Sequence, residues 1–214
     1  MLFTQTETVV LDSQRKKLDE YAEILLRINE GINLTGAKNK DEFERKHIQD
    51  SVLAFSQVQK TNLPVEQYID VGSGGGIPGI ILAILSPATR VTLVERRVKK
   101  ATALLSIVKE LGLEDRVKVL AKPFEEIKPV HSKAVIWFRG FLPGPKLIAF
   151  LSKNFKAQEL PTLVLMKGPS WSKEKEELLL VPNIAKEWRS RFEKSETISY
   201  KLPENSGDRV LVFV

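Results

Sequence analysis

One stretch of this chain constrains its fold more than any other. Residues 68–79 read YIDVGSGGGIPG: apolar residues lead into an acid, a glycine-dense turn follows, and Pro78 stands where the first turn of a helix is expected. Glycine adopts positive φ at little cost and lets a ligand approach the backbone closely. A helix N-terminus offers free N–H groups and a partial positive charge. The stretch therefore predicts a strand, a ligand-binding loop and a helix.

The spacing of the glycines separates two kinds of ligand. A dinucleotide site prefers G-x-G-x-x-G, whereas here Gly72, Gly74 and Gly76 alternate and Asp70 precedes them. The acid would repel a pyrophosphate, but it suits a cofactor with a cationic amino acid end, such as S-adenosylmethionine (SAM). A solvent-exposed turn without a ligand is the alternative. The loop thus favours SAM and disfavours a nicotinamide-dependent oxidoreductase.

Residue usage excludes several other classes of protein. The chain has no cysteine, which excludes disulfides, thiolate metal sites and cysteine nucleophiles. It has two histidines, His47 and His131, so we expect no metal site. No apolar run is long enough to span a bilayer, and the first residues lack the basic and apolar segments of a signal peptide. We expect a cytoplasmic monomer with no membrane partner.

The net charge of +6 is compatible with a nucleic acid partner, because binding to phosphates releases counterions. Many basic proteins bind no nucleic acid, so the charge alone leaves the partner open.

The first sixty residues predict a small helical extension. Apolar residues recur at three- and four-residue steps over residues 11–30, and Gly31 is a natural C-cap. A second helix is expected from Asp41, with Glu44 three residues later completing a capping box. The segment 60–66 is the candidate boundary, so we divide the chain into a helical cap (1–60) and a methyltransferase domain (61–214).

From residue 67 onward, predicted strands alternate with predicted helices. Such alternation indicates a parallel sheet with helices on both faces, and two closing strands joined only by a turn at 204–208 pair antiparallel. We therefore predict an α/β fold: a Rossmann-like, mostly parallel seven-stranded sheet with an antiparallel terminal hairpin, as in class I SAM-dependent methyltransferases. The predicted strands are 68–71, 91–94, 117–120, 134–138, 162–166, 197–201 and 209–214, and the helices are 78–85, 99–111, 145–155 and 171–180.

In such a sheet, ligands bind beyond the carboxyl ends of the strands. The second predicted strand ends at Glu95, where an acid can accept hydrogen bonds from both ribose hydroxyls of a nucleoside. The alternative is a surface acid that pairs with Arg96 or Arg97. After the third strand, Phe124 could flank an adenine and Glu125 could read its edge, but Phe124 serves equally well as a core residue.

Two cations follow the next strands. Arg139 and Lys167 end neighbouring predicted strands, which favours a site for a phosphate, a base or the cofactor carboxylate over plain solvation. His47 lies on the mainly apolar face of the second helix, where a packed core histidine is common; near Asp50 it could instead shape a substrate pocket.

The densest basic cluster stands at the start of a predicted helix, where the helix dipole disfavours cations. It comprises Arg96, Arg97, Lys99 and Lys100. The cluster is either a contact for RNA phosphates or a solvated charged turn.

Three motifs together resemble the RsmG (GidB) family of bacterial methyltransferases, which act on guanine N7 in 16S ribosomal RNA. They are NLT at 33–35, KHIQDS at 46–51 and DVGSGGGIPGI at 70–80. The resemblance extends over nearly the whole chain. It implies SAM as the cofactor, 16S rRNA or the 30S particle as the partner, and cofactor contacts at Gly72, Ile77, the pair after the third strand and Arg139.

The chain departs from the family pattern at two places. It has KPFE at 122–125 where the family has Arg-Ala-Glu, so Pro123, Phe124 and Glu125 stay open as adenine contacts. It has FRG at 138–140 where the family has Ser-Arg-Ala, and Ala134 in place of an acid. The arginine is kept while its neighbours differ, so the shape of the guanine pocket stays open.

These observations combine into one prediction: transfer of a methyl group from SAM to guanine N7 of 16S rRNA. Because N7 carries a lone pair, we predict no catalytic base, and orientation and electrostatics carry the reaction. The expected cofactor residues are Asp70, Gly72, Gly74, Gly76, Ile77, Glu95, Phe124, Glu125 and Arg139, and the substrate-facing residues are Arg139, Lys167, His47 and Asn33. A SAM-dependent methyltransferase of another substrate and a non-catalytic RNA-binding protein with this fold are the rivals.

Overall fold

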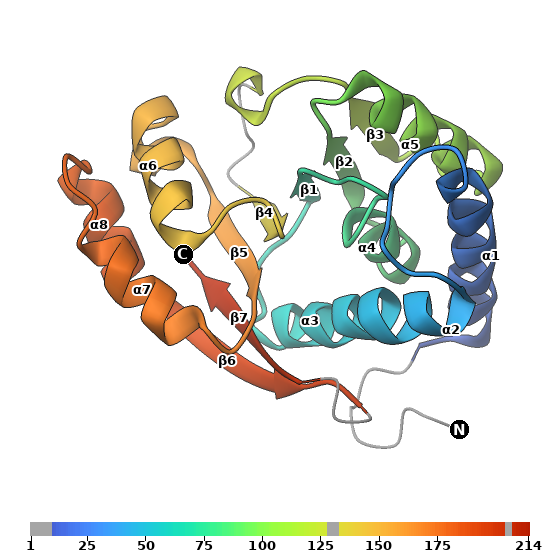
Figure 1. Ribbon diagram of the computed structural model, residues 1–214, viewed down its shortest axis with the longest axis horizontal. Coiled ribbons are helices and arrows are strands. Elements are labelled where there is room, and N and C mark those ends of the chain that lie inside the picture. Colours follow the sequence, from blue (N-terminus) through green and yellow to red (C-terminus); the bar gives the residue numbers. More distant parts are fainter. Residues whose placement is uncertain (1–9, 128–132, 204–206) are drawn as a thin grey trace.

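The computed structural model describes residues 10–127, 133–203 and 207–214. Within them the chain forms one seven-stranded sheet of order β3-β2-β1-β4-β5-β7-β6 (Figure 1). The first five strands are parallel, and β7 runs antiparallel to both β5 and β6. This confirms the predicted fold class. The strands are β1 (Gln67–Val71), β2 (Arg90–Val94), β3 (Val117–Leu120), β4 (Ala134–Arg139), β5 (Thr162–Lys167), β6 (Glu196–Lys201) and β7 (Asp208–Phe213).

Helices cover both faces of the sheet (Figure 1). One face carries α1 (Asp12–Asn29), α3 (Gln49–Lys60), α4 (Gly79–Leu85) and α5 (Val98–Glu110). The other carries α6 (Gly144–Asn154), α7 (Trp171–Leu179) and α8 (Lys186–Glu193). Short segments complete the described chain: α2 (Lys40–Phe43), the π-helix η1 (Glu44–Ile48), and the 3₁₀ turns η2 (Phe124–Glu126) and η3 (Ala157–Glu159).

The strands send alternate side chains into the two cores, as their period of two requires. In β4, Val135 and Trp137 pack against the helices of one face, while Ile136 and Phe138 pack against those of the other. All four are nearly inaccessible to solvent. Burial on both faces explains why the central strands read as continuous apolar runs.

Some local predictions were wrong. The second helix begins at Lys40, where Asn39 is the N-cap and its Oδ1 accepts a hydrogen bond from the backbone N–H of Glu42 at 2.9 Å, so Asp41 is not the cap. Helix α1 ends with Glu30 as its C-cap, not Gly31. Helix α8 was not predicted, because its eight residues are mostly charged and only two aromatic side chains are buried. Part of the predicted turn at 204–208 lies outside the described residues.

The helical extension shares a core with the sheet. Tyr21 and Leu25 of α1 belong to the same buried cluster as Ile80 of α4 and Tyr68 of β1. The Tyr21 hydroxyl donates a hydrogen bond to the carbonyl of Gly75 at 2.8 Å, so α1 also contacts the glycine loop. The division into domains at residue 60 stays a prediction. Across the part of the chain that the structure describes, no helix has both the length and the apolar character needed to cross a lipid bilayer.

Candidate active site

The glycine loop runs from the end of β1 to the start of α4. Gly72 and Gly74 have φ of +75° and +55°, a region that favours glycine. The N–H groups of Gly72 and Ser73 both donate to the carbonyl of Val94, which ties the loop to β2. A Cβ on Gly72 would lie 2.9 Å from Cδ2 of Phe141. The loop therefore presents bare backbone close to the segment that follows β4.

Asp70 lies beneath this loop. Its side chain is buried, and its Oδ2 accepts a hydrogen bond from the N–H of Gly79 at 3.1 Å, at the start of α4. Burial raises the pKa of Asp70 to about 7. Asp70 thus joins β1 to α4, and the structure does not place it in the lining of the cavity described next. Its predicted contact with the cofactor's amino acid end stays a prediction.

A cavity of about 540 Å³ opens at the carboxyl ends of β1, β2 and β4, within the range of small-molecule sites. Of the predicted cofactor residues, five border it: Gly72, Gly74, Glu95, Phe124 and Glu125. Gly76 and Ile77 are buried and do not border it, and Ile77 belongs to the core cluster. Arg139 is not in its lining, but the adjacent Gly140 is. Pro123, the third candidate for an adenine contact, also borders it.

The Glu95 carboxylate is held at this cavity by backbone groups. Its Oε2 accepts a hydrogen bond from the N–H of Gly74 at 3.1 Å, and its Oε1 accepts one from the N–H of Arg97 at 2.8 Å. The residue is only 6% exposed. Each carboxylate oxygen retains a further lone pair for a ligand. Glu95 is therefore oriented by two backbone N–H groups, one of them from the glycine loop, and it forms no ion pair with Arg96 or Arg97, both of which the structure describes.

Phe124 packs in the core and also borders the cavity, so its contact with the adenine stays a prediction. It borders the cavity, yet it is 3% exposed and packs in an aromatic cluster, with its ring centroid 5.8 Å from that of Phe138 and 5.0 Å from that of Phe155. Phe141, which sequence reasoning missed, lies over Gly72 and borders the same cavity. Nothing in its sequence neighbourhood indicates this position, because it depends on the path of the chain after β4.

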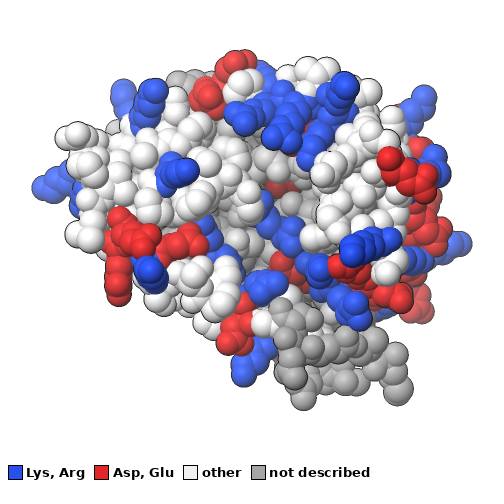
Figure 2. All heavy atoms as spheres, viewed as in Figure 1, with Lys and Arg blue, Asp and Glu red and all other residues white. Residues whose placement is uncertain are grey.

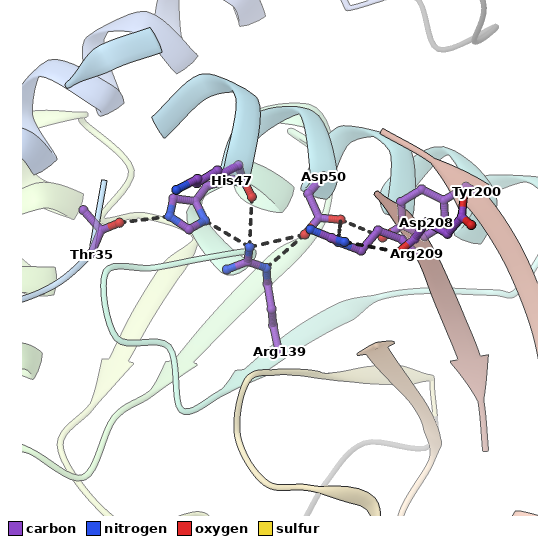
Figure 3. Close-up of polar contacts among 8 residues, drawn as sticks. Thr35, His47, Asp50, Arg139, Tyr200, Asp208 and Arg209 are labelled. Carbon is purple, nitrogen blue, oxygen red and sulfur yellow. Dashed lines mark hydrogen bonds and ion pairs between the residues drawn. The ribbon is translucent and has the colours of Figure 1, made fainter. Parts of the chain in front are cut away.

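Arg139 extends from the end of β4 toward the helical extension (Figure 3). Its Nη2 donates to Nδ1 of His47 at 3.0 Å, to the carbonyl of Lys46 at 3.1 Å and to Oδ2 of Asp50 at 3.2 Å. Its Nε donates to the same Oδ2 at 3.3 Å. Within the described residues, Nη1 makes no hydrogen bond. Two predicted substrate-facing residues, Arg139 and His47, are therefore in direct contact.

His47 is a neutral ring with a defined tautomer. Burial, with help from the charges of Arg139 and Lys46, lowers its pKa to about 4. Because Nδ1 accepts from Arg139, the proton lies on Nε2, which is 2.9 Å from Oγ1 of Thr35 and donates to it. The Asn-Leu-Thr motif thus reaches this site through Thr35, a residue that sequence reasoning did not single out.

Asp50 links the extension to three strands of the sheet (Figure 3). While Oδ2 accepts from Arg139, Oδ1 accepts from the hydroxyl of Tyr200 at 2.8 Å and lies 3.7 Å from Nε of Arg209. The Asp50 side chain is only 4% exposed. A buried carboxylate requires such partners, but no local pattern shows that they come from β4, β6 and β7.

Lys167 and Asn33 lie outside this cluster. The Nζ of Lys167 donates to Oε2 of Glu174 at 2.8 Å and to the carbonyl of Leu142 at 3.2 Å, so this cation is already paired. It borders a second cavity of about 360 Å³, which shares Gly140, Phe141 and Leu142 with the first. Asn33 is exposed and borders a shallow pocket at the start of α5.

Cations gather on the rim of the central hollow, as Figure 2 shows. The rim residues Arg96, Arg97, Lys100 and Lys122 all border the larger cavity. Lys99 stands beside them in the shallow pocket with Asn33. Among the described residues, no group of three or more His, Cys, Asp or Glu side chains is arranged to hold a metal ion.

Comparison with known proteins places this arrangement in context. Residues 14–198 match the model of the GidB family, described as rRNA small subunit methyltransferase G. The chain is 33% identical over 213 residues to the ribosomal RNA small subunit methyltransferase G of Vibrio campbellii, covering 100% of this chain and 93% of that protein. It is 34% identical over 200 residues to the protein of the same name from a Ruegeria species, covering 90% and 89%.

Solved structures show a similar fold at low identity. An O-methyltransferase from Bacillus cereus in complex with SAH superposes with a TM-score of 0.54 and 15% identity, covering 91% of this chain and 90% of that one. A mutant of MtNAS in complex with S-adenosylmethionine superposes with a TM-score of 0.54 and 10% identity, covering 94% and 75%. These similarities concern the fold alone.

Proposed function

Because the chain belongs to the rRNA small subunit methyltransferase G (GidB) family, we propose that it methylates N7 of a guanine in 16S rRNA. Membership supports the general activity, SAM-dependent methylation of ribosomal RNA. The choice of guanine N7, and of 16S rRNA or the 30S particle as the form recognised, is the finer proposal. A cytoplasmic location and a monomeric state stay predictions that accompany it.

The larger cavity fits the cofactor by its chemistry as well as its size. S-adenosylmethionine supplies a methyl group on a positively charged sulfur. The bare backbone of Gly72 and Gly74 leaves room for its amino acid end, and the carboxylate of Glu95 accepts from its ribose hydroxyls. The orientation of Glu95 by two backbone N–H groups supports this role.

The part of the site that binds the substrate needs a hydrogen-bond donor and no general base. Guanine N7 attacks with its own lone pair, so the protein has no proton to remove, and a neutral His47 with a pKa of about 4 agrees with this. Arg139 Nη1 is the donor without a partner among the described residues, and we assign it to a guanine oxygen or a phosphate of the substrate. The basic rim attracts the RNA backbone.

The observation that carries the proposal is the arrangement of two oriented charges around the sheet edge: Glu95 at the end of β2 and Arg139 at the end of β4. Strand β1 lies between β2 and β4 in the sheet, so the glycine loop that follows β1 lies between these charges.

The test is methyl transfer from labelled SAM to 30S particles and to naked 16S rRNA that lack the modification, followed by mapping of the labelled nucleotide. We expect one labelled guanine, modified at N7. Label on another base or another atom contradicts the finer proposal and leaves the family assignment intact. RNA binding without SAM binding in calorimetry would instead support the non-catalytic alternative.

A further inference from the structure

Arg139 comes from the sheet, but the acceptors that hold it come from the helical extension. Its hydrogen bonds reach the carbonyl of Lys46, the ring of His47 and the carboxylate of Asp50 (Figure 3). We propose that Asp50 is a positioning residue, which orients the guanidinium of Arg139 so that Nη1 points to the reacting partners. This inference rests on the role of Arg139 given above.

The geometry at Asp50 suits this task. One oxygen, Oδ2, accepts from both Nε and Nη2 of Arg139, which fixes the plane of the guanidinium. The other oxygen, Oδ1, is held by the Tyr200 hydroxyl and by Arg209, so the carboxylate itself cannot turn freely. Charge-assisted hydrogen bonds of this kind are stronger than neutral ones, and here they are shielded from water.

The charges around Asp50 also leave Arg139 able to act. Two cations, Arg139 and Arg209, face a single carboxylate. His47 adds no charge at neutral pH, and Lys46 is paired with Glu42. These side chains together keep a net positive charge, which Asp70 offsets in part because its carboxyl also interacts with Arg139. This charge favours an electronegative ligand at the unbonded Nη1.

A purely structural role for Asp50 is the rival explanation, because its carboxylate also joins α3 to the terminal hairpin through Tyr200. The two explanations differ in how Asp50 depends on Arg139. A structural residue contributes whether or not Arg139 is present, whereas a positioning residue contributes only through it.

A double-mutant cycle with Asp50→Asn and Arg139→Gln separates them. We expect Asp50→Asn to lower kcat/KM for methyl transfer to 30S particles by about 30-fold in the wild-type background and by less than about threefold in the Arg139→Gln background. Equal losses in both backgrounds would overturn the inference.

Tyr200→Phe is the matched control, since it removes one hydrogen bond to Oδ1 while Arg209 still holds that oxygen and both contacts of Oδ2 with Arg139 remain. We expect it to lower the thermal midpoint, although by less than Asp50→Asn does, while keeping kcat/KM within roughly threefold of wild type. If Tyr200→Phe reproduces the full kinetic loss of Asp50→Asn, the structural role is sufficient. Asp50→Glu, which keeps the charge and displaces the carboxylate, replaces Asp50→Asn if that variant does not fold.

A second readout does not depend on activity. The Nε–H of Arg139, which donates to Asp50, gives its own signal in nitrogen-15 NMR spectra and is assigned by its loss in Arg139→Gln. We expect its hydrogen exchange to accelerate roughly tenfold or more in Asp50→Asn and to change little in Tyr200→Phe. An unchanged exchange rate in Asp50→Asn overturns the inference, even if the wild-type protein modifies a different substrate.

Discussion

We assign the glycine loop to the cofactor and the Asp50 network to the substrate, and the chain builds these two regions in different ways. The Asp50 network comprises Thr35, His47, Asp50, Arg139, Tyr200 and Arg209. The loop consists of successive residues between β1 and α4, and its shape comes from backbone conformation. The network joins residues as far apart as Thr35 and Arg209 through their side chains. A loop of the first kind can be read from residue types, whereas a network of the second kind exists only once the sheet order has brought its members together.

Substitutions in the two regions should therefore have different effects. Substitutions in the loop region should change the affinity for the cofactor or the stability of the loop backbone. Changes in the network act on the orientation of side chains and leave cofactor binding largely intact. The following variants break or sharpen this distinction.

The largest expected effect is on SAM affinity in Glu95→Ala. Losing hydrogen bonds from a buried carboxylate to a ligand costs about 2–3 kcal/mol, so we expect the dissociation constant to rise roughly 100-fold. Isothermal titration calorimetry measures it, with Glu126→Ala as the control, because Glu126 is exposed and does not border the cavity; for it we expect a change of less than about threefold. Unchanged affinity in Glu95→Ala removes the assigned role.

The next effect is on stability in Gly72→Ala. A Cβ there meets the Phe141 ring at 2.9 Å and also sits at positive φ, so we expect unfolding to require about 1–3 kcal/mol less. Gly168→Ala is the matched control, because a Cβ there has no neighbour within 4 Å. Urea denaturation measures the free energy of unfolding of both variants. If Gly72→Ala costs no stability in the Phe141→Ala background, steric contact alone explains the loss.

The next effect is on the pH dependence of stability. Asp70, next to the glycine loop, and His47, in the Asp50 network, change the free energy of unfolding with pH in opposite directions. The pKa of Asp70 is raised from 3.8 to about 7, so between these values the folded chain holds a proton that the unfolded chain has released, and stability falls as pH rises. The pKa of His47 is lowered from 6.5 to about 4, so between these values the unfolded chain binds the extra proton, and stability is lost as pH falls.

Replacing either group should therefore change the slope of unfolding free energy against pH in opposite directions. Between about pH 4.5 and 6.5, Asp70→Asn should make the slope more positive and His47→Gln should make it more negative. Urea midpoints measured across this window test both signs at once. Parallel changes in the two variants would show that the assumed protonation states are wrong.

The smallest effect is expected where the extension supports the loop. Tyr21→Phe removes the hydrogen bond to the Gly75 carbonyl and should weaken SAM binding by about fivefold or less, a cost of about 1 kcal/mol. Tyr200→Phe, which removes the corresponding hydroxyl from the network, should leave SAM affinity unchanged. If both variants weaken SAM binding alike, the two regions are coupled more tightly than their contacts indicate.

Much of the fold could be predicted because its signals are local. Strand periodicity, the glycine loop and the closing hairpin each depend on residues near one another in the chain. Helix α8 was missed because a short, highly charged segment with Trp188 and Phe192 as its buried side chains carries little periodic signal. The N-cap was misplaced by two residues because Asn39 and Asp41 are both good caps.

The site was predicted only in part, for the same physical reason. Glu95 and Gly72 follow directly from the ends of predicted strands, and both border the cavity. Asp70 precedes the glycine loop, but its Oδ2 accepts a hydrogen bond from Gly79 of α4 and it does not border the cavity, so its contact with the cofactor stays a prediction. No local sequence pattern indicates the roles of Phe141 and Asp50. The position of Phe141 depends on the path of the segment after β4, and the contacts of Asp50 depend on where the last strands lie.

The place of β7 in the sheet has a consequence for how the protein is made. Strand β6 leaves the ribosome before β7, yet β7 lies between β5 and β6. During synthesis β6 therefore has no edge to pair with until the strand that follows it has emerged. Tyr200 and Arg209 lie on these same two strands. A nascent chain can therefore fold the nucleoside-binding half of the sheet before the carboxylate of Asp50 has contacts with these two residues.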